Sequence, residues 1–290
     1  MLFRSSEFRY RNPVIKPGTV VVGVSQSGET ADTLAVIRDM KRIGIFTLGL
    51  TNVRGSSISR EADATFYTCA GPEIGVAATK TFFTQMLVFL LWAGNLGLRH
   101  KGRSGEFQKL FQGIVELPHL LEDFLSPDSK VLKAVQNSSK ALADIRGFFF
   151  MGRGFSFPIA LEAALKLKEI AYVHAEGYAA GELKHGPIAM IDENMAVVVL
   201  APQDQWREKT VSNLEEVKAR GAKILGIGSD GDHSMIELCD HWIPIPSQID
   251  ENLMPFLLAP IIQLFSYEVA VRKGTDIDKP RNLAKSVTVE

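Results

Sequence analysis

The stretch that decides the fold is Val20-Val21-Val22-Gly23-Val24, which runs directly into Ser25-Gln26-Ser27-Gly28-Glu29-Thr30. The valine run predicts a buried strand, and residues 31–40 continue as a helix. In α/β proteins, ligands bind where a strand ends and the next helix begins. The first N–H groups of such a helix are unpaired and carry partial positive charge, so this junction predicts a site that attracts an anion.

The loop after the strand supplies neutral hydrogen-bond donors. Ser25, Ser27 and Thr30 each carry a hydroxyl, and Gly28 allows close approach of the backbone. Because the loop contains no Lys or Arg, a nucleotide triphosphate cradle of the GxxxxGK[ST] type is excluded here. Ser27 or Thr30 could instead simply cap the helix. Three hydroxyls in so short a loop exceed what one cap needs, which favours a phosphate or sugar-phosphate site.

Composition bounds the class of protein. The chain has 290 residues, of which 46% are hydrophobic and 22% charged, as in a soluble globular protein of two domains. A net charge of −1 provides no basic field for nucleic acid. The longest apolar run, residues 86–93, is shorter than the ~20 residues that span a membrane, and residues 1–11 show no signal peptide. Cys69 and Cys239 predict buried, inert thiols in a reducing compartment, so we expect a cytoplasmic protein.

The chain contains an internal repeat. Residues 18–52 read strand, loop, helix and strand, and residues 194–230 follow the same order. Each copy continues with a further strand and closes with a long apolar helix: 64–68 and 76–96 in the first copy, 241–245 and 253–273 in the second. This alternation predicts an α/β fold of two domains, each a parallel sheet flanked by helices on both faces.

The two copies differ at their start. The second opens with an additional strand at 147–151 and a helix at 158–172, for which the first has no counterpart. By this internal symmetry, the first domain is expected to lack its first strand and helix. The expected organisation is a first domain at 1–101, a helical connector at 102–144, a second domain at 145–275 and a tail at 276–290.

Charged side chains recur on one face of the helix predicted within residues 160–172. Glu162, Lys166 and Glu169 are spaced i, i+4 and i+7, while Leu161 and Leu165 are among its apolar positions. Two interpretations stay open. The charges form either a solvated stripe or part of a catalytic site.

The next segment, residues 175–187, favours the catalytic interpretation. Three glycines and a proline surround Glu182, Lys184 and His185, and this composition predicts a loop or short helix. A histidine in such a connection, beside acid and amine groups, is a candidate general acid–base.

The C-terminal stretch DIDKPRNLAKSVTVE, residues 276–290, has little apolar periodicity. Chain ends usually fray, but Pro280 and the small residues after it suggest an extended segment that packs. Lys285 would then have surroundings in which its amine could be held near a ligand.

Together these segments resemble the isomerase part of the glutamine–fructose-6-phosphate aminotransferase family, which consists of two tandem sugar isomerase (SIS) domains and a tail. The resemblance covers the whole chain and rests on SEFRYR, SQSGETADTL, EIGVAATK, ALKLKEIAYVHAEGYAAGELKHGP and DKPRNLAKSVTVE. It implies fructose 6-phosphate as ligand, glucosamine 6-phosphate as product, a homodimer, and no cofactor or metal.

The resemblance also implies residue roles. The sugar phosphate would be held by Ser25, Gln26, Ser27 and Thr30, with the backbone at Val76 and the residue Ala284 lining the sugar. The catalytic set would be Glu169 as the base that moves a proton between C1 and C2, His185 of the neighbouring subunit for ring opening, Lys285 for a Schiff base with the ketone, and Lys166 to support the enediolate or enolamine charge.

Two features of the family have no match in this sequence. These are an opening strand with a Cys-Gly-Thr-Ser loop and the N-terminal glutaminase domain that supplies ammonia, so the chain is expected to be a fragment. Two alternatives remain: a non-catalytic SIS regulator that binds sugar phosphate, and a stand-alone sugar-phosphate isomerase or deaminase. A regulator would need the loop at 25–30 but not Glu169, His185 and Lys285.

Overall fold

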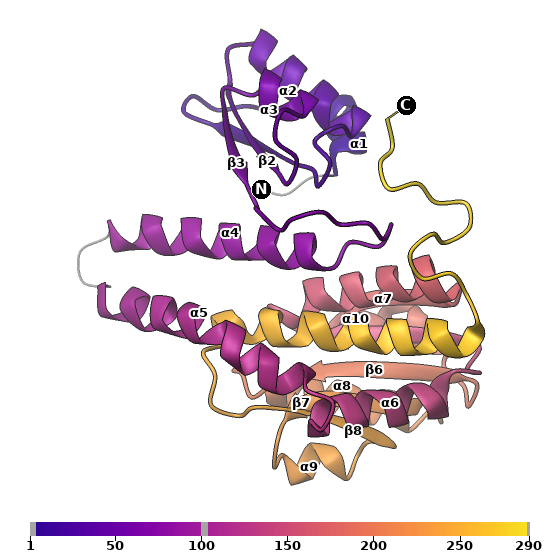
Figure 1. Cartoon of the computed structure of the whole chain (residues 1–290). Helices are drawn as coiled ribbons and strands as arrows, with labels where there is room; N and C mark the ends of the chain where they lie inside the picture. Colours follow the sequence, from indigo (N-terminus) through magenta and orange to yellow (C-terminus); the bar gives the residue numbers. More distant parts are fainter. Residues whose placement is uncertain (1–3, 100–103, 289–290) are drawn as a thin grey trace. The chain divides into compact units, whose positions relative to one another are not determined.

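The computed structural model describes residues 4–99 and 104–288, which form two compact units. The first unit extends to Trp92 and also includes the residues from Asn282 onward, and the second extends from Ala93 to Arg281 (Figure 1). Each unit is built around its own parallel sheet.

The first unit has a three-stranded sheet in the order β1-β2-β3, with all pairs parallel. The strands are β1 Val20–Val24, β2 Phe46–Thr51 and β3 Ala64–Tyr67. The helices are α1 Ser5–Phe8, η1 Arg9–Arg11, α2 Ala31–Arg42, α3 Ser57–Glu61 and the beginning of α4 Lys80–Leu98. Phe8 packs with Val36 and Met40 of α2 in a small apolar cluster.

The second unit has a five-stranded parallel sheet in the order β5-β4-β6-β7-β8. The strands are β4 Gly147–Gly152, β5 His174–Ala179, β6 Met195–Ala201, β7 Lys223–Ser229 and β8 His241–Ile245. The helices are α5 Ser104–Leu125, α6 Lys130–Leu142, α7 Ser156–Ala171, α8 Arg207–Lys218, α9 His233–Ile236 and α10 Met254–Lys273, with short 3-10 helices η2 Ala180–His185, η3 Pro187–Met190 and η4 Glu251–Leu253.

The expected α/β fold class is confirmed, and the sheet order shows the repeat directly. β1, β2 and β3 follow one another as β6, β7 and β8 do, with α2 and α8 after the first strand of each set. Among the described residues, the first sheet has no strands that correspond to β4 and β5.

Residues 174–179 correct one expectation. The sequence predicted a loop or short helix across 175–187, but its first part is strand β5, and only 180–185 form the short helix η2. Gly177 explains the misleading composition: a Cβ there would lie 2.7 Å from the carbonyl oxygen of Ala160 on α7. The glycine therefore marks close packing of a helix on a strand and not a loop.

The two cysteines also differ from expectation. Cys69 is exposed, whereas Cys239 is partly covered, and burial raises the pKa of its thiol to about 12. The prediction of two buried thiols is wrong for Cys69, which lies just beyond the end of β3.

Two helices are long and apolar enough to cross a membrane by length and composition alone. In the most apolar stretch that includes α10, 61% of the residues are buried, as in the core helix of a soluble unit, whereas for α4 the share is 11%. No membrane assignment follows from these two helices.

Candidate functional site

The loop from Ser25 to Thr30 leaves the carboxyl end of β1 and is held by backbone hydrogen bonds. Ser25 N donates to the carbonyl of Leu50 at 3.0 Å, and Gln26 O accepts from Asn52 N at 3.0 Å. Gly28 has φ +70°, and a Cβ on it would lie 2.1 Å from Ser56 Oγ, so no other residue fits there without rearrangement. The loop is therefore a fixed element of the first unit.

Two of the three hydroxyls of this loop face each other. Ser25 Oγ lies 2.7 Å from Thr30 Oγ1 and accepts a hydrogen bond from Gly28 N at 3.1 Å. Thr30 occupies the N-cap position of α2, but its side chain makes no capping hydrogen bond. The capping interpretation is therefore wrong for Thr30, and its hydroxyl is part of the cluster at the helix N-terminus.

The C-terminal tail packs beside the same loop. Ser286 Oγ lies 2.9 Å from Ser27 Oγ, and the carbonyl of Val287 accepts from Ala31 N, the first N–H of α2, at 3.2 Å. The tail therefore lies against the loop through these two contacts, as the sequence suggested, although Leu283 and Val287 are exposed. Ala284, which precedes Lys285, is exposed.

Lys285 is held by two acceptors of the segment that follows β3. Its Nζ donates to the carbonyl of Gly75 at 2.6 Å and to Glu73 Oε2 at 3.3 Å. Val76, which the resemblance placed at the sugar, is the next residue and is half-buried. The structure thus brings Lys285 and the Val76 segment together within the first unit.

Glu73 is a site residue that the sequence reasoning did not single out, although it begins the EIGVAATK motif. Its side chain is almost fully buried and accepts hydrogen bonds from Thr79 N and from Thr81 Oγ1. Burial opposes ionisation, but these hydrogen bonds and the charge of Lys285 outweigh it and lower the pKa of the carboxyl. An ionised Glu73 therefore fixes the position of the Lys285 amine.

In the second unit, α7 carries the charged residues singled out earlier. Ala, Leu, Lys and Glu dominate this segment and favour a helix, which ends at Tyr172 in the left-handed conformation. Lys166 is only 3% exposed. Its Nζ donates to Glu169 Oε2 at 2.6 Å and lies 3.3 Å from Glu162 Oε1, where the contact is an ion pair without good hydrogen-bond alignment.

This burial rules out a solvated stripe. The charged face of α7 points inward, while Leu161 and Leu165, expected on the apolar face, are exposed. Burial raises the pKa of Glu162 to about 7, against the opposing charge of Lys166. A buried amine between two carboxylates, one of which titrates near neutrality, is an arrangement suited to proton transfer.

His185 ends η2 and is exposed, as are Glu182 and Lys184. No hydrogen bond between described residues joins His185 to Glu169. In residues 4–99 and 104–288, no group of three or more His, Cys, Asp or Glu side chains is placed to hold a metal ion.

A family model and curated relatives of known name both assign this chain to the same family. The SIS domain model matches residues 2–93 and 141–273. The glutamine–fructose-6-phosphate aminotransferase [isomerizing] of Methanosarcina acetivorans is 47% identical over 286 residues, and that of Thermotoga maritima is 47% identical over 290 residues. The matches cover 98% and 99% of this chain, respectively, but only 46% of each relative's length.

Solved structures of related proteins support the same family assignment. The C-terminal domain of glucosamine-fructose-6-phosphate aminotransferase from Francisella tularensis superposes with a TM-score of 0.86 at 38% identity, covering 95% of this chain and 77% of that one. A glucosamine-6-phosphate deaminase of Thermotoga maritima, at 22% identity and a TM-score of 0.76 over 98% of this chain and 80% of that one, shares the fold. The chain therefore belongs to the SIS domain family and, within it, to the C-terminal isomerase part of the glutamine–fructose-6-phosphate aminotransferases.

Proposed function

We propose that this chain performs the sugar-isomerisation half of glucosamine 6-phosphate synthesis, in which fructose 6-phosphate and ammonia react. The observation that carries the proposal is the placement of Lys285. Its amine is fixed by Glu73 and Gly75. The tail that carries it is bonded to the loop at 25–30, the hydroxyl loop. A protein that only binds sugar phosphate needs the loop and has no use for a positioned amine, which disfavours the regulator.

Substrate binding is assigned to the first unit. The phosphate would accept hydrogen bonds from Ser25, Ser27 and Thr30, with Gln26 as a further donor, at the N-terminus of α2. Neutral donors suffice there because the helix terminus supplies partial positive charge.

The proton transfers are assigned to the second unit. His185, supplied by the partner subunit of a homodimer, would move a proton to the ring oxygen as the sugar opens. Glu169 would take a proton from C1 and return it to C2, which turns the ketose skeleton into that of an aldose. Lys166, buried against Glu169, would stabilise the negative charge that develops on the enediolate or enolamine.

Lys285 would act as a nucleophile. After passing a proton to Glu73, its amine would add to C2 of the open-chain ketone and lose water to give a Schiff base. Ammonia would then replace the lysine at C2 and release its amine. The ammonia would come from a glutaminase domain of the kind that the longer relatives' activity requires.

Borohydride trapping tests this function. With fructose 6-phosphate present, reduction is expected to add one sugar phosphate to the peptide that contains Lys285, and Lys285→Arg is expected to abolish the adduct. Mass spectrometry of the digested protein locates it. An adduct on Lys166, or none in the wild-type chain, would contradict the role given to Lys285.

A further inference from the structure

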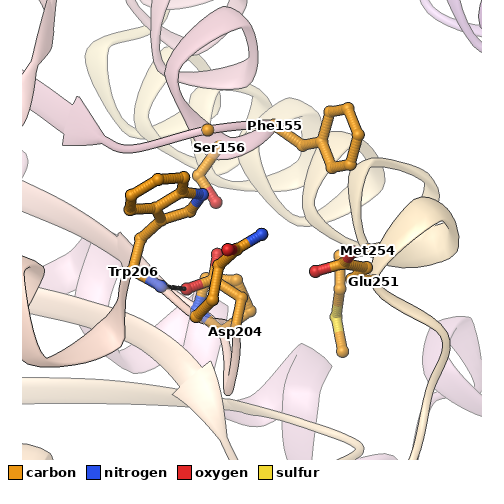
Figure 2. A pocket seen from close by; sticks show the side chains of 9 residues that line it. Phe155, Ser156, Asp204, Trp206, Glu251 and Met254 are labelled. Carbon is orange, nitrogen blue, oxygen red and sulfur yellow. Dashed lines mark hydrogen bonds between the residues drawn. The ribbon is translucent and has the colours of Figure 1, made fainter.

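A cavity of about 330 Å³ opens in the second unit where β4 and β6 end (Figure 2). It is lined by Gly154, Phe155, Ser156, Pro202, Asp204, Gln205, Trp206, Glu251 and Met254. The loop at 202–206 follows β6 as the hydroxyl loop at 25–30 follows β1. The cavity therefore lies where the repeat would place a ligand site in the second unit.

The chemistry of this cavity differs from that of the hydroxyl loop. Its lining contains two carboxylates, Asp204 and Glu251, and among the described residues no Lys or Arg lines it. The basic side chains nearby have other partners: Arg207 is bonded to Asp232 at 2.6 Å, and Lys209 lies over the Trp206 ring. A phosphate would meet two like charges without a counterion, so the cavity disfavours a phosphorylated ligand.

The remaining groups suit a ring with hydroxyls. Ser156 is 2% exposed, and its hydroxyl points into the cavity toward Trp206 without a hydrogen-bond partner among the described residues (Figure 2). Trp206 and Phe155 provide exposed aromatic surface, and buried Met254 lies at the opposite side. The Ser156 hydroxyl is thus available at the cavity wall to bond a hydroxyl of a ligand.

Asp204 and Glu251 favour a positively charged group on the ligand, because both carboxylates line the cavity. Asp204 Oδ1 accepts from Trp206 N at 2.8 Å, and burial nevertheless raises the pKa of the Asp204 carboxyl. A ligand cation beside Asp204 and Glu251 would offset the cost of burying this carboxylate. An indole face also attracts cations and packs against apolar ring faces.

We propose that this cavity binds a phosphate-free amino sugar of hexose size, with its ammonium group at Asp204 and Glu251, one ring face on Trp206, and a hydroxyl on Ser156. The site is separate from the hydroxyl loop of the first unit and does not depend on the function proposed above.

Calorimetric titration of the whole chain tests the proposal with glucosamine and glucose as probes. Glucosamine is expected to bind about tenfold more tightly than glucose, as one charge-assisted interaction would give. Equal affinities, or no binding of glucosamine at tens of millimolar, would overturn it.

Variants locate the site. Asp204→Asn and Glu251→Gln are each expected to weaken glucosamine binding about tenfold. Glu251 is exposed, so its variant tests the site even if Asp204→Asn fails to fold. Glu237→Gln removes an exposed carboxylate outside the cavity and is expected to leave the affinity unchanged. Unchanged affinity in Glu251→Gln, or an equal loss in Glu237→Gln, would refute the assignment.

Discussion

Helices α4 and α10 close the two copies of the same repeat, yet they have opposite surroundings. α10 packs against α7 and α6 and lies in the core of the second unit (Figure 1). α4 is as apolar, but few residues of its apolar stretch are buried. Among the described residues, the first unit has no counterpart of β4 and α7, both of which α10 contacts in the second unit. Apolar composition thus decides what a helix can bury, while the neighbouring elements decide what it does bury.

The sheets show the same difference. Every residue of β6 is buried, since β6 is a central strand with helices on both faces. Its counterpart β1 is an edge strand, and Val20 is 51% exposed. The loops after these strands also differ, with hydroxyls after β1 and acidic and aromatic groups after β6. The proposed roles divide accordingly, with phosphate binding in the first unit and proton transfer in the second.

Glu169→Gln tests this division of roles, and its expected effect is the largest of the four predictions. In an enzyme that includes the glutaminase part, it is expected to lower exchange of the C1 proton with solvent by about 10²–10⁴-fold, because it removes the base while keeping the shape. Binding of fructose 6-phosphate is expected to persist. NMR in deuterated water measures the exchange, and a near-wild-type rate would move the base elsewhere, with Glu182 next to be tested.

A pair of truncations tests the contrast between the helices. Leu257→Ala in α10 removes a fully buried side chain and is expected to cost about 2–5 kcal/mol of unfolding free energy. Leu91→Ala in α4 is the matched control, and because Leu91 is exposed the expected change is within about 0.5 kcal/mol. Chemical unfolding followed by circular dichroism measures both. Equal losses would mean that α4 is as well packed as α10.

Glu162→Gln tests the buried charges of the second unit through pH. The carboxyl pKa is about 7 in the folded chain against an ordinary value of 4.5, so the folded state binds the extra proton between these values. Its stabilising contribution is present below pH 4.5 and is lost as the pH rises through 7. The variant, which cannot titrate, is therefore expected to gain stability relative to the wild type by on the order of 3 kcal/mol from pH 4.5 to 8.

Unfolding measured across this pH range, with Glu237→Gln as the exposed control, checks the prediction for Glu162. A difference between variant and wild type that stays constant with pH would show that Glu162 titrates normally in the folded chain.

Thr30→Val and Ser27→Ala test the first unit and have the smallest expected effects. Each is expected to weaken binding of fructose 6-phosphate by ~1–3 kcal/mol, the usual cost of losing a hydrogen bond to a charged group. Thr84→Val is the control, because its hydroxyl bonds to the Lys80 carbonyl within α4 and lies outside the loop. If calorimetry finds the same affinity for all three variants, the loop does not bind the phosphate.

Much of the first unit's site could be read from local sequence. A valine run, a hydroxyl loop and a helix are determined by neighbouring residues, so β1, the loop and α2 were predicted closely, as was the repeat that relates them to β6 and α8. The family motifs pointed to Lys285 and Glu169, although the roles of both residues remain predictions.

Tertiary structure alone decided the rest, because it depends on contacts between residues distant in sequence. The composition around Gly177 predicted a loop or short helix, whereas α7 packs closely on β5 there. The spacing of the charges on α7 left a solvated stripe and a catalytic site both open, and the burial of Lys166 excludes the stripe. Glu73 gains its role only because a tail more than two hundred residues away brings Lys285 to it. Periodicity reports which side chains share a face, whereas the packing of the whole unit determines whether that face meets water, another charge or the core.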